Sequence, residues 1–242
     1  MKSQFPGFPK EGLQFLRAIA RNNNRDWFLP RKPVFEEQVK KPMLQLVEAV
    51  NQAMKRFAPD YVTEPNKAVY RFYRDTRFSK DKKPYKEHIA ASFRHKFLGT
   101  EGVGAGFYFH VSAKEVGIGG GVYMPPPETL LAIRGHMAEY HQEFEKLLQA
   151  RAVKRLLGEL QGDQLTRVPK GFSAEHPAAG LLRRKQFLLW AELPGEAAGT
   201  PELYEAIVSR FQAMAPFMEF LNAPVAAAGR KKPRIDAREL LG

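Results

Sequence analysis

Residues 106–123 read GFYFHVSAKEVGIGGGVY and contain two β-rich runs, 106–112 and 116–123, on either side of the short polar turn 113–115. This spacing is typical of an antiparallel hairpin. In the first run Phe107 and Phe109 alternate with Tyr108 and His110. Because successive side chains of a strand point to opposite faces, one face of this hairpin is apolar and the other is polar. The hairpin is therefore expected to cover a core with one face only.

Amphipathic helices surround this hairpin in the sequence. After three prolines, residues 128–148 carry an apolar stripe that includes Leu130, Met137 and Phe144, which predicts a helix. Similar spacing predicts helices over 11–21, 33–57, 152–160 and 201–221, the second of them interrupted or kinked at Pro42. Further strands are expected over 67–75, 164–168 and 185–193. The predicted fold is α+β: an antiparallel sheet with a central hairpin packed against several amphipathic helices.

The length of 242 residues and a hydrophobic content of 44% fit one domain, expected over 1–224, with a basic and flexible tail over 225–242. The absence of cysteine excludes disulfides, thiolate metal sites and cysteine nucleophiles. No apolar run approaches the roughly 18 residues of a membrane span, so no membrane contact is expected. Pro6, Gly7 and Pro9 interrupt the place where a signal peptide would be apolar, which favours a cytoplasmic protein.

The net charge of +12 is concentrated in two places. Residues 67–96 hold ten Lys and Arg against Asp75, Asp81 and Glu87, and residues 225–242 hold five against Asp236 and Glu239. The rest of the chain is nearly neutral. A localised excess of this kind indicates an anionic partner more than a general solubility device.

The run RDTRFSKDKKPYKEH, residues 74–88, is the strongest candidate for that partner's site. Arginine offers a planar fork for phosphate or carboxylate, and lysine adds a mobile charge. The alternative is a solvated loop whose charges pair locally, Asp75 with Arg77 or Asp81 with Lys83. No catalytic residue, cofactor or metal ligand set is assigned. The predicted ligand-binding residues are Arg74, Arg77, Lys80, Lys83, Tyr85, Lys86, Gly120 and Tyr123.

Gly120 belongs to the sequence GIGGGVY, which lacks the Gly-Lys-Ser/Thr of a phosphate-binding loop. Glycines in a strand more often permit a bulge or a close approach of two backbones. If the hairpin packs beside the basic loop, their bare amides could instead cradle an anion, with Tyr123 and Arg134 as neighbours.

Two other polar features remain open. His110 lies mid-strand on the face of Tyr108, where it is either a hydrogen-bonded core histidine or a proton-transfer group. The corner over residues 22–27, NNNRDW, ends one helix and caps the next, and Asn23 and Arg25 would enlarge a cleft only if the corner approaches the basic loop.

Three motifs resemble the family called domain of unknown function 2461: GFPKEGLQFLRAIARNNNRDWF near the start, RFYRDTRFSKDKKPYKEH in the middle, and GGGVYMPPPETLLAIR after it. The resemblance covers about residues 5–222 and leaves out the basic residues 230–234. It implies a compact α+β protein and no particular activity.

Three hypotheses follow for function. The first is binding of, or chemistry on, a small phosphorylated or carboxylated ligand at the basic loop. The second is nucleic-acid binding through the same loop and the tail, with Tyr70, Tyr73 and Phe78 available for stacking. The third is docking of an acidic protein. A single cleft further requires that the regions around Trp27, Lys80 and Gly120 meet.

Overall fold

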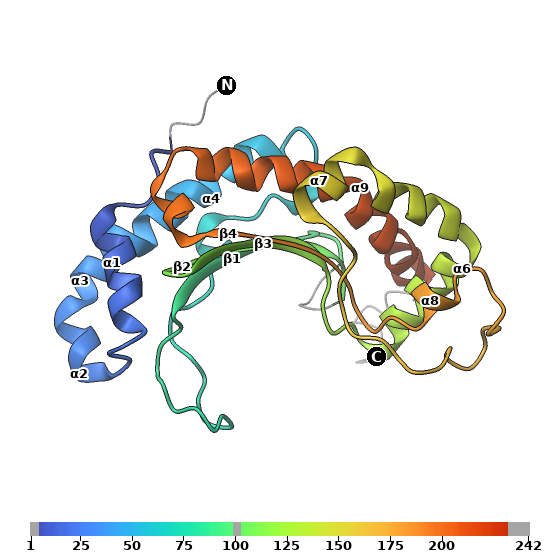
Figure 1. The fold of residues 1–242 in the computed structure, drawn as a ribbon, viewed down its shortest axis with the longest axis horizontal. Helices are drawn as coiled ribbons and strands as arrows, with labels where there is room; N and C mark the ends of the chain where they lie inside the picture. The colour runs from blue at the N-terminus through green and yellow to red at the C-terminus, as the bar shows by residue number, and fades with distance from the viewer. Residues whose placement is uncertain (1–4, 99–102, 232–242) are drawn as a thin grey trace, which may run out of the picture.

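The computed structural model describes residues 5–98 and 103–231. Its strands form one sheet, and its helices flank that sheet as shown in Figure 1. The strands are β1 (His88–Arg94), β2 (Gly106–Ser112), β3 (Glu115–Val122) and β4 (Phe187–Pro194). The α-helices are α1 (Lys10–Ile19), α2 (Arg25–Phe28), α3 (Lys32–Phe35), α4 (Lys41–Met54), α5 (Pro65–Ala68), α6 (Pro127–Gln149), α7 (Arg151–Leu157), α8 (Ala179–Leu182) and α9 (Glu202–Lys231).

The sheet is antiparallel throughout and has the order β1-β2-β3-β4. The expected hairpin supplies its two central strands, with Phe107 opposite Gly120 and Phe109 opposite Ile118. The predicted fold class, α+β with a central hairpin, is therefore confirmed.

One face of the sheet is buried against helices, and the other is open. Phe107 and Phe109 of β2 and Ile118 of β3 are at most 1% exposed and belong to the core. Figure 1 shows α4 and α9 lying over this convex face. No helix of the described residues lies over the centre of the concave face, which is bordered by α1 to α3 at one end and by α6 and α8 at the other. The alternation in β2 predicted this one-sided burial, since Tyr108 and Ser112 remain partly exposed.

The expected strand over 67–75 is wrong. Pro65–Ala68 form the short helix α5, and beyond it Val69 and Tyr73 make only isolated bridges, to Ala91 and Tyr85. The sequence pattern did not predict β1, which begins at His88, directly after the charged run. The aromatic and β-branched content of 69–73 imitates a strand, whereas His88–Arg94 owes its strand geometry to pairing with β2 along its whole length.

The chain on either side of the sheet follows the predicted pattern with different boundaries. A π-helical turn, η2 (Glu36–Lys40), precedes α4, and Pro42 stands in the first turn of α4, so the expected interruption at Pro42 is a helix start. The short strand expected over 164–168 is reduced to a bridge between Gln164 and Arg184. α9 continues beyond the predicted boundary at residue 224 to Lys231, and the remainder of the expected tail lies outside the described residues.

In residues 5–98 and 103–231 no helix is both long enough and apolar enough to cross a membrane.

Candidate functional site

Aromatic and small residues alternate in one row across the open face of the sheet. The register places Ser92, Tyr108, Gly119 and Trp190 side by side on β1, β2, β3 and β4. The rings of Tyr108 and Trp190 stack with centroids 6.0 Å apart and planes inclined by 29°. On the far side, the ring of Tyr70 lies 6.4 Å from that of Tyr108. The open face therefore carries a row of aromatic rings that leads from β4 past β1.

The glycines of β3 make room for this row. A Cβ at Gly119 would lie 2.5 Å from both the carbonyl oxygen of Leu189 and the indole of Trp190. A Cβ at Gly117 would collide with the rings of His110 and Trp190. Trp190 therefore lies flat over backbone, and its Nε1 donates a hydrogen bond to Glu192 at 2.9 Å. This is the close approach that glycine in a strand permits.

A cavity of about 690 Å³ opens beside the aromatic row. The next register row is Arg94, Gly106, Gly121 and Leu188, so the two central strands present only glycine backbone there. Gly121 has φ +133°, a conformation that L side chains rarely adopt. The volume lies within the range of small-molecule sites. The side chains that line this cavity include Tyr70, Arg94, Tyr108, Tyr123, Trp190 and Glu192.

The polar groups of the cavity differ in charge and burial. Arg94 is an exposed cation whose Nη2 lies 3.5 Å from the Tyr70 hydroxyl. Burial, with a smaller contribution from Tyr70, raises the pKa of Tyr108 to about 12, so this phenol stays protonated at neutral pH. Burial also lowers the pKa of His95, so its imidazole is uncharged at neutral pH. Within the described lining, Arg94 supplies the positive charge and Glu192 the negative one.

His110 belongs to a neighbouring cluster on the same face. It is 9% exposed, its ring lies 5.0 Å from that of His88, and its Nε2 lies 3.4 Å from Glu115 Oε1. Burial lowers its pKa against the opposing effect of Glu115 and Glu192. Burial and the proximity of His110 lower the pKa of His88 to about 4. His110 therefore has a carboxylate partner, and both histidines are neutral at physiological pH.

The predicted basic loop is a projecting arm, which we define as residues 72–86. Its stem pairs through the Arg74 amide, which donates to Pro84 O at 2.9 Å, and through the Lys86 amide, which donates to Phe72 O at 2.9 Å. Tyr85 is 1% exposed and stacks on Phe28 with centroids 4.1 Å apart. In Figure 1 the arm descends beyond the sheet on the side of α1 to α3.

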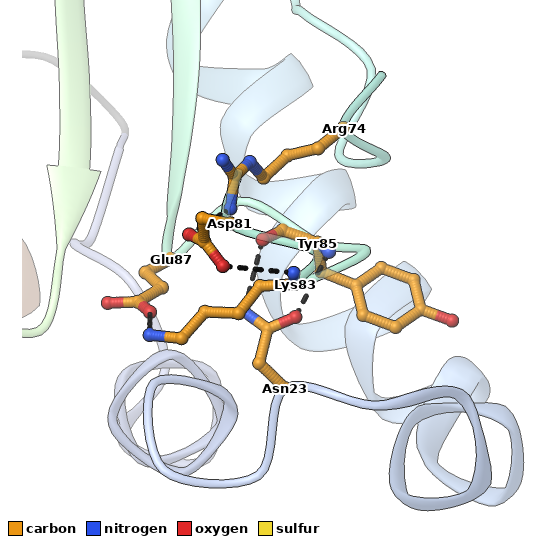
Figure 2. Close-up of polar contacts among 6 residues, drawn as sticks. All are labelled: Asn23, Arg74, Asp81, Lys83, Tyr85 and Glu87. Carbon is orange, nitrogen blue, oxygen red and sulfur yellow. Dashed lines mark hydrogen bonds and ion pairs between the residues drawn. The ribbon is translucent and has the colours of Figure 1, made fainter. Parts of the chain in front are cut away.

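Several cations of the arm form ion pairs with carboxylates nearby in the chain. Figure 2 shows Asp81 between Arg74, whose Nη1 lies 2.6 Å from Asp81 Oδ2, and the Lys83 amide, which donates to Asp81 Oδ1 at 3.0 Å. Arg77 makes a bidentate pair with Asp75, and Lys83 Nζ lies 2.8 Å from Glu87. These hydrogen bonds lower the pKa of Asp75 and Asp81 and raise that of Lys83. Of the two local ion pairs considered from sequence, Asp75 with Arg77 is formed, whereas the Asp81 carboxylate pairs with Arg74 and the Lys83 ammonium pairs with Glu87.

The polar corner after α1 does meet the arm. Asn23 Nδ2 donates to Tyr85 O at 3.0 Å, and the Tyr85 amide donates to Asn23 Oδ1 at 3.0 Å (Figure 2). Asn24 caps α2 by accepting from the Trp27 amide at 2.9 Å. The corner that contains Trp27 therefore contacts the stem of the arm at Tyr85.

The structure divides the remaining predicted residues between two places. Gly120 and Tyr123 line the cavity, and a Cβ at Gly120 would collide with Met218 of α9. Lys80 is exposed on the arm. Lys86 connects the two places, because its Nζ lies 4.8 Å from the ring centroid of Tyr70 in the cavity wall.

Sequence reasoning missed Arg94 and Trp190. The alternation in β2 already placed Tyr108 on a polar face, but Arg94 ends a strand that was not recognised. Nothing in a single chain indicated that Trp190 would face Gly119. Among the described residues no group of three His, Asp or Glu side chains is placed to hold a metal ion.

Comparison with known proteins gives a family and no named relative. The chain matches no curated protein and no solved structure. The model of one family, described as conserved hypothetical protein (DUF2461), matches residues 11–220, a segment that contains the arm, the sheet and the cavity. The chain therefore belongs to the family of conserved hypothetical proteins that share domain of unknown function 2461.

Proposed function

We propose that the protein binds a small ligand that combines a planar ring with a phosphate or carboxylate, in the cavity on the open face of the sheet. The observation that carries this proposal is the glycine floor of Gly106 and Gly121 beside the stacked rings of Tyr108 and Trp190. A flat group can approach bare backbone there and contact the aromatic wall. An open strand face without such a function would ordinarily carry polar side chains at these positions.

The anionic group is assigned from the charges around the cavity. Arg94 lines it, and Lys86 reaches the ring of Tyr70 at its wall. A guanidinium binds phosphate or carboxylate through paired hydrogen bonds, and a lysine contributes a movable charge. Glu192 accepts a hydrogen bond from Trp190, which turns this carboxylate toward the indole. Arg94 and Lys86 are the cations suited to the anion.

The predicted arm residues take a secondary part in this proposal. Arg74, Arg77 and Lys83 hold carboxylates of the arm and its stem. A small ligand in the cavity therefore uses these outer cations of the arm only through long-range attraction.

The test is a thermal-shift screen of nucleotides, aromatic carboxylates and sugar phosphates, followed by calorimetric titration of each compound that raises the melting temperature. A ligand at one hundred times its Kd adds about 2.7 kcal/mol of stability. Arg94→Gln is expected to weaken binding of the anionic compound about tenfold and to leave an uncharged analogue unaffected. Tyr108→Leu should weaken both.

Lys10→Gln is the matched control, because Lys10 is an exposed cation on α1. Sugar phosphates without a planar ring that bind as tightly as nucleotides would overturn the role of the aromatic wall. Binding that survives both Arg94→Gln and Tyr108→Leu would place the ligand elsewhere and overturn the proposal.

A further inference from the structure

We infer that the ligand class of this site is single-stranded nucleic acid, with one base in the cavity and the adjoining strand following the aromatic row to the arm. This rests on the proposed function, since the cavity is the start of the path. It adds the arm as a second point of contact. The arguments are the course of the aromatic rings, the exposed tip of the arm and the distribution of charge.

The aromatic rings form a path from the cavity to the base of the arm. Trp190 stacks on Tyr108, Tyr108 is 6.4 Å from Tyr70, and Lys86 Nζ lies 4.8 Å from the ring centroid of Tyr70. Lys86 is part of the paired stem of the arm through its bond to Phe72. Successive bases of a single strand stack on such rings with little sequence preference, because every base has a flat face.

The arm carries an aromatic side chain that the fold does not use. Phe78 is 95% exposed, and the guanidinium of Arg77 lies 5.7 Å from its ring centroid. Full exposure of a phenylalanine leaves its apolar surface in water, which is unfavourable relative to burial. A ring with a cation beside it, on an arm that projects beyond the sheet, is suited to stack on a base whose phosphate contacts that cation.

The charges near this path favour a polyanion over a single anionic group. Residues 74–83 hold five Lys and Arg against Asp75 and Asp81. Among the residues that the structure describes, Lys80 and Lys82 have no carboxylate partner, and Lys82 Nζ donates only to Thr76 O at 3.0 Å. The open face also carries two carboxylates, Glu115 beside His110 and Glu192 beside Trp190. One small ligand in the cavity gives Lys80 and Lys82 no anion to bind, whereas a nucleic-acid strand has a phosphate at every nucleotide for them to contact.

The strand must be single. In a duplex the flat faces of the bases are stacked on one another and cannot contact Tyr108 or Phe78. The inference therefore separates this protein from a general basic surface, which attracts duplex and single strand alike.

The experiment measures binding affinity by fluorescence anisotropy over a range of salt concentrations. The labelled probes are a mononucleotide, single strands of four and twelve nucleotides, and a duplex of twelve base pairs. Affinity is expected to rise at least tenfold from one residue to twelve and to exceed that for the duplex. Phe78→Ala should weaken binding of the twelve-residue strand about tenfold and leave the mononucleotide unchanged. The double variant Lys80→Glu and Lys82→Glu should also reduce the slope of log K against log salt by about 0.7 for each phosphate that the protein no longer neutralises.

Matched controls keep the result specific to the arm. Lys10→Glu with Lys55→Glu makes the same change in net charge at exposed positions on α1 and just after α4, and Leu131→Ala removes another exposed apolar side chain, on α6. Weakening by these controls equal to that of the arm variants would overturn the inference. The inference would also be overturned if heparin and the twelve-residue strand bound with equal affinity and Phe78→Ala changed neither affinity. That result is expected of a docking surface for any acidic partner.

The outcomes also separate this inference from the proposed function. One outcome is that a mononucleotide binds, that Tyr108→Leu weakens its binding, and that longer oligonucleotides bind no more tightly. This outcome would overturn the inference and support the small-ligand site. Length-dependent binding that is unaffected by Tyr108→Leu would overturn the inference, because the path would then not begin in the cavity. Mononucleotide binding that survives both Arg94→Gln and Tyr108→Leu would overturn the proposed function as well.

Discussion

Asn23 and Tyr85 are 62 residues apart in the chain, and the side-chain amide of Asn23 bonds both the N–H and the C=O of Tyr85, at 3.0 Å each. Tyr85 bridges to Tyr73 within the stem, and the Asn23 amide binds the backbone N–H and C=O that Tyr85 presents on its other edge. Beside it, the ring of Tyr85 is inserted against Phe28. The arm is therefore held at its base by both polar and aromatic contacts, while its outer residues remain exposed.

Removal of the Asn23 amide should destabilise the protein. Asn23→Ala leaves the two backbone groups of Tyr85 without their partner in a partly buried position, and we expect a loss of about 2 kcal/mol in the free energy of unfolding. Denaturant titration measures it. Asn22→Ala is the control, because the Asn22 side chain is exposed and donates to Ala18 O, four residues away. Equal effects of the two variants would contradict the clamp.

Substitution by alanine should lower the stability of the protein at Gly119 and raise it at Gly135. A Cβ at Gly119 meets Leu189 O and Trp190 at 2.5 Å, so Gly119→Ala should cost about 1–3 kcal/mol. A Cβ at Gly135, inside α6, meets nothing within 4 Å, so Gly135→Ala should add about 0.5–1 kcal/mol.

The fluorescence of Trp190 gives an independent test of its contact with Gly119. In a Trp27→Phe background Trp190 is the single tryptophan of the chain. Gly119→Ala should shift its emission, and Gly135→Ala should not. An unchanged spectrum in Gly119→Ala would show that Trp190 does not lie over this glycine.

His88 should make the protein sensitive to mild acid. Its pKa is about 4 in the folded protein against 6.5 in an unfolded chain, so the unfolded state binds the proton more tightly. The stability is therefore complete above about pH 6.5 and declines as the pH falls toward 4, by up to about 3 kcal/mol.

Unfolding free energies measured from pH 7 to pH 4 should decline less steeply in His88→Gln than in the natural protein. His110, whose pKa is lowered by burial, keeps its own contribution in that variant. Parallel pH profiles for the two proteins would contradict the assignment to His88.

Asp81→Asn should raise the affinity of the arm for polyanions. The variant retains an oxygen for the Lys83 amide but removes the charge that pairs with Arg74. Both groups of the pair are exposed enough for solvent to weaken it, so the free energy of unfolding should hardly change. Oligonucleotide affinity should rise about threefold at low salt, and the gain should vanish at high salt. A decrease at low salt would mean that Arg74 acts on the arm's shape and not on the ligand.

The sequence was sufficient for the fold class because the decisive signals are local. The alternation of Phe107 and Phe109 with Tyr108 fixed the buried face of the central hairpin, and the stripe through Met137 and Phe144 fixed α6. β1 was not predictable in this way. Its residues Ile89, Ala90 and Ala91 are a short run after a charged segment, and their strand geometry depends on β2 as partner.

The candidate site was predicted only in part, because it depends on register. Gly120 and Tyr123, which the sequence predicts to bind a ligand, line the cavity, and their binding of a ligand stays a prediction. The row that joins Tyr108 to Trp190 could be predicted only from the pairing of β3 with β4, which places Gly119 opposite Trp190. The local pairing of Arg77 with Asp75 was foreseeable from their spacing. The contact of Asn23 with Tyr85 was not, since it spans 62 residues.

The glycines of β3 also bear on the order of folding. β3 has eight residues, of which Gly117, Gly119, Gly120 and Gly121 are half, and each costs about 0.5–1 kcal/mol relative to alanine in a strand. The hairpin of β2 and β3 is thus poorly stable by itself, although it is the most local pairing in the sheet. β4, about seventy residues later in the chain, stabilises the hairpin by pairing with β3 and covering the glycines with Trp190. We therefore expect closure of that long loop to limit the rate of folding.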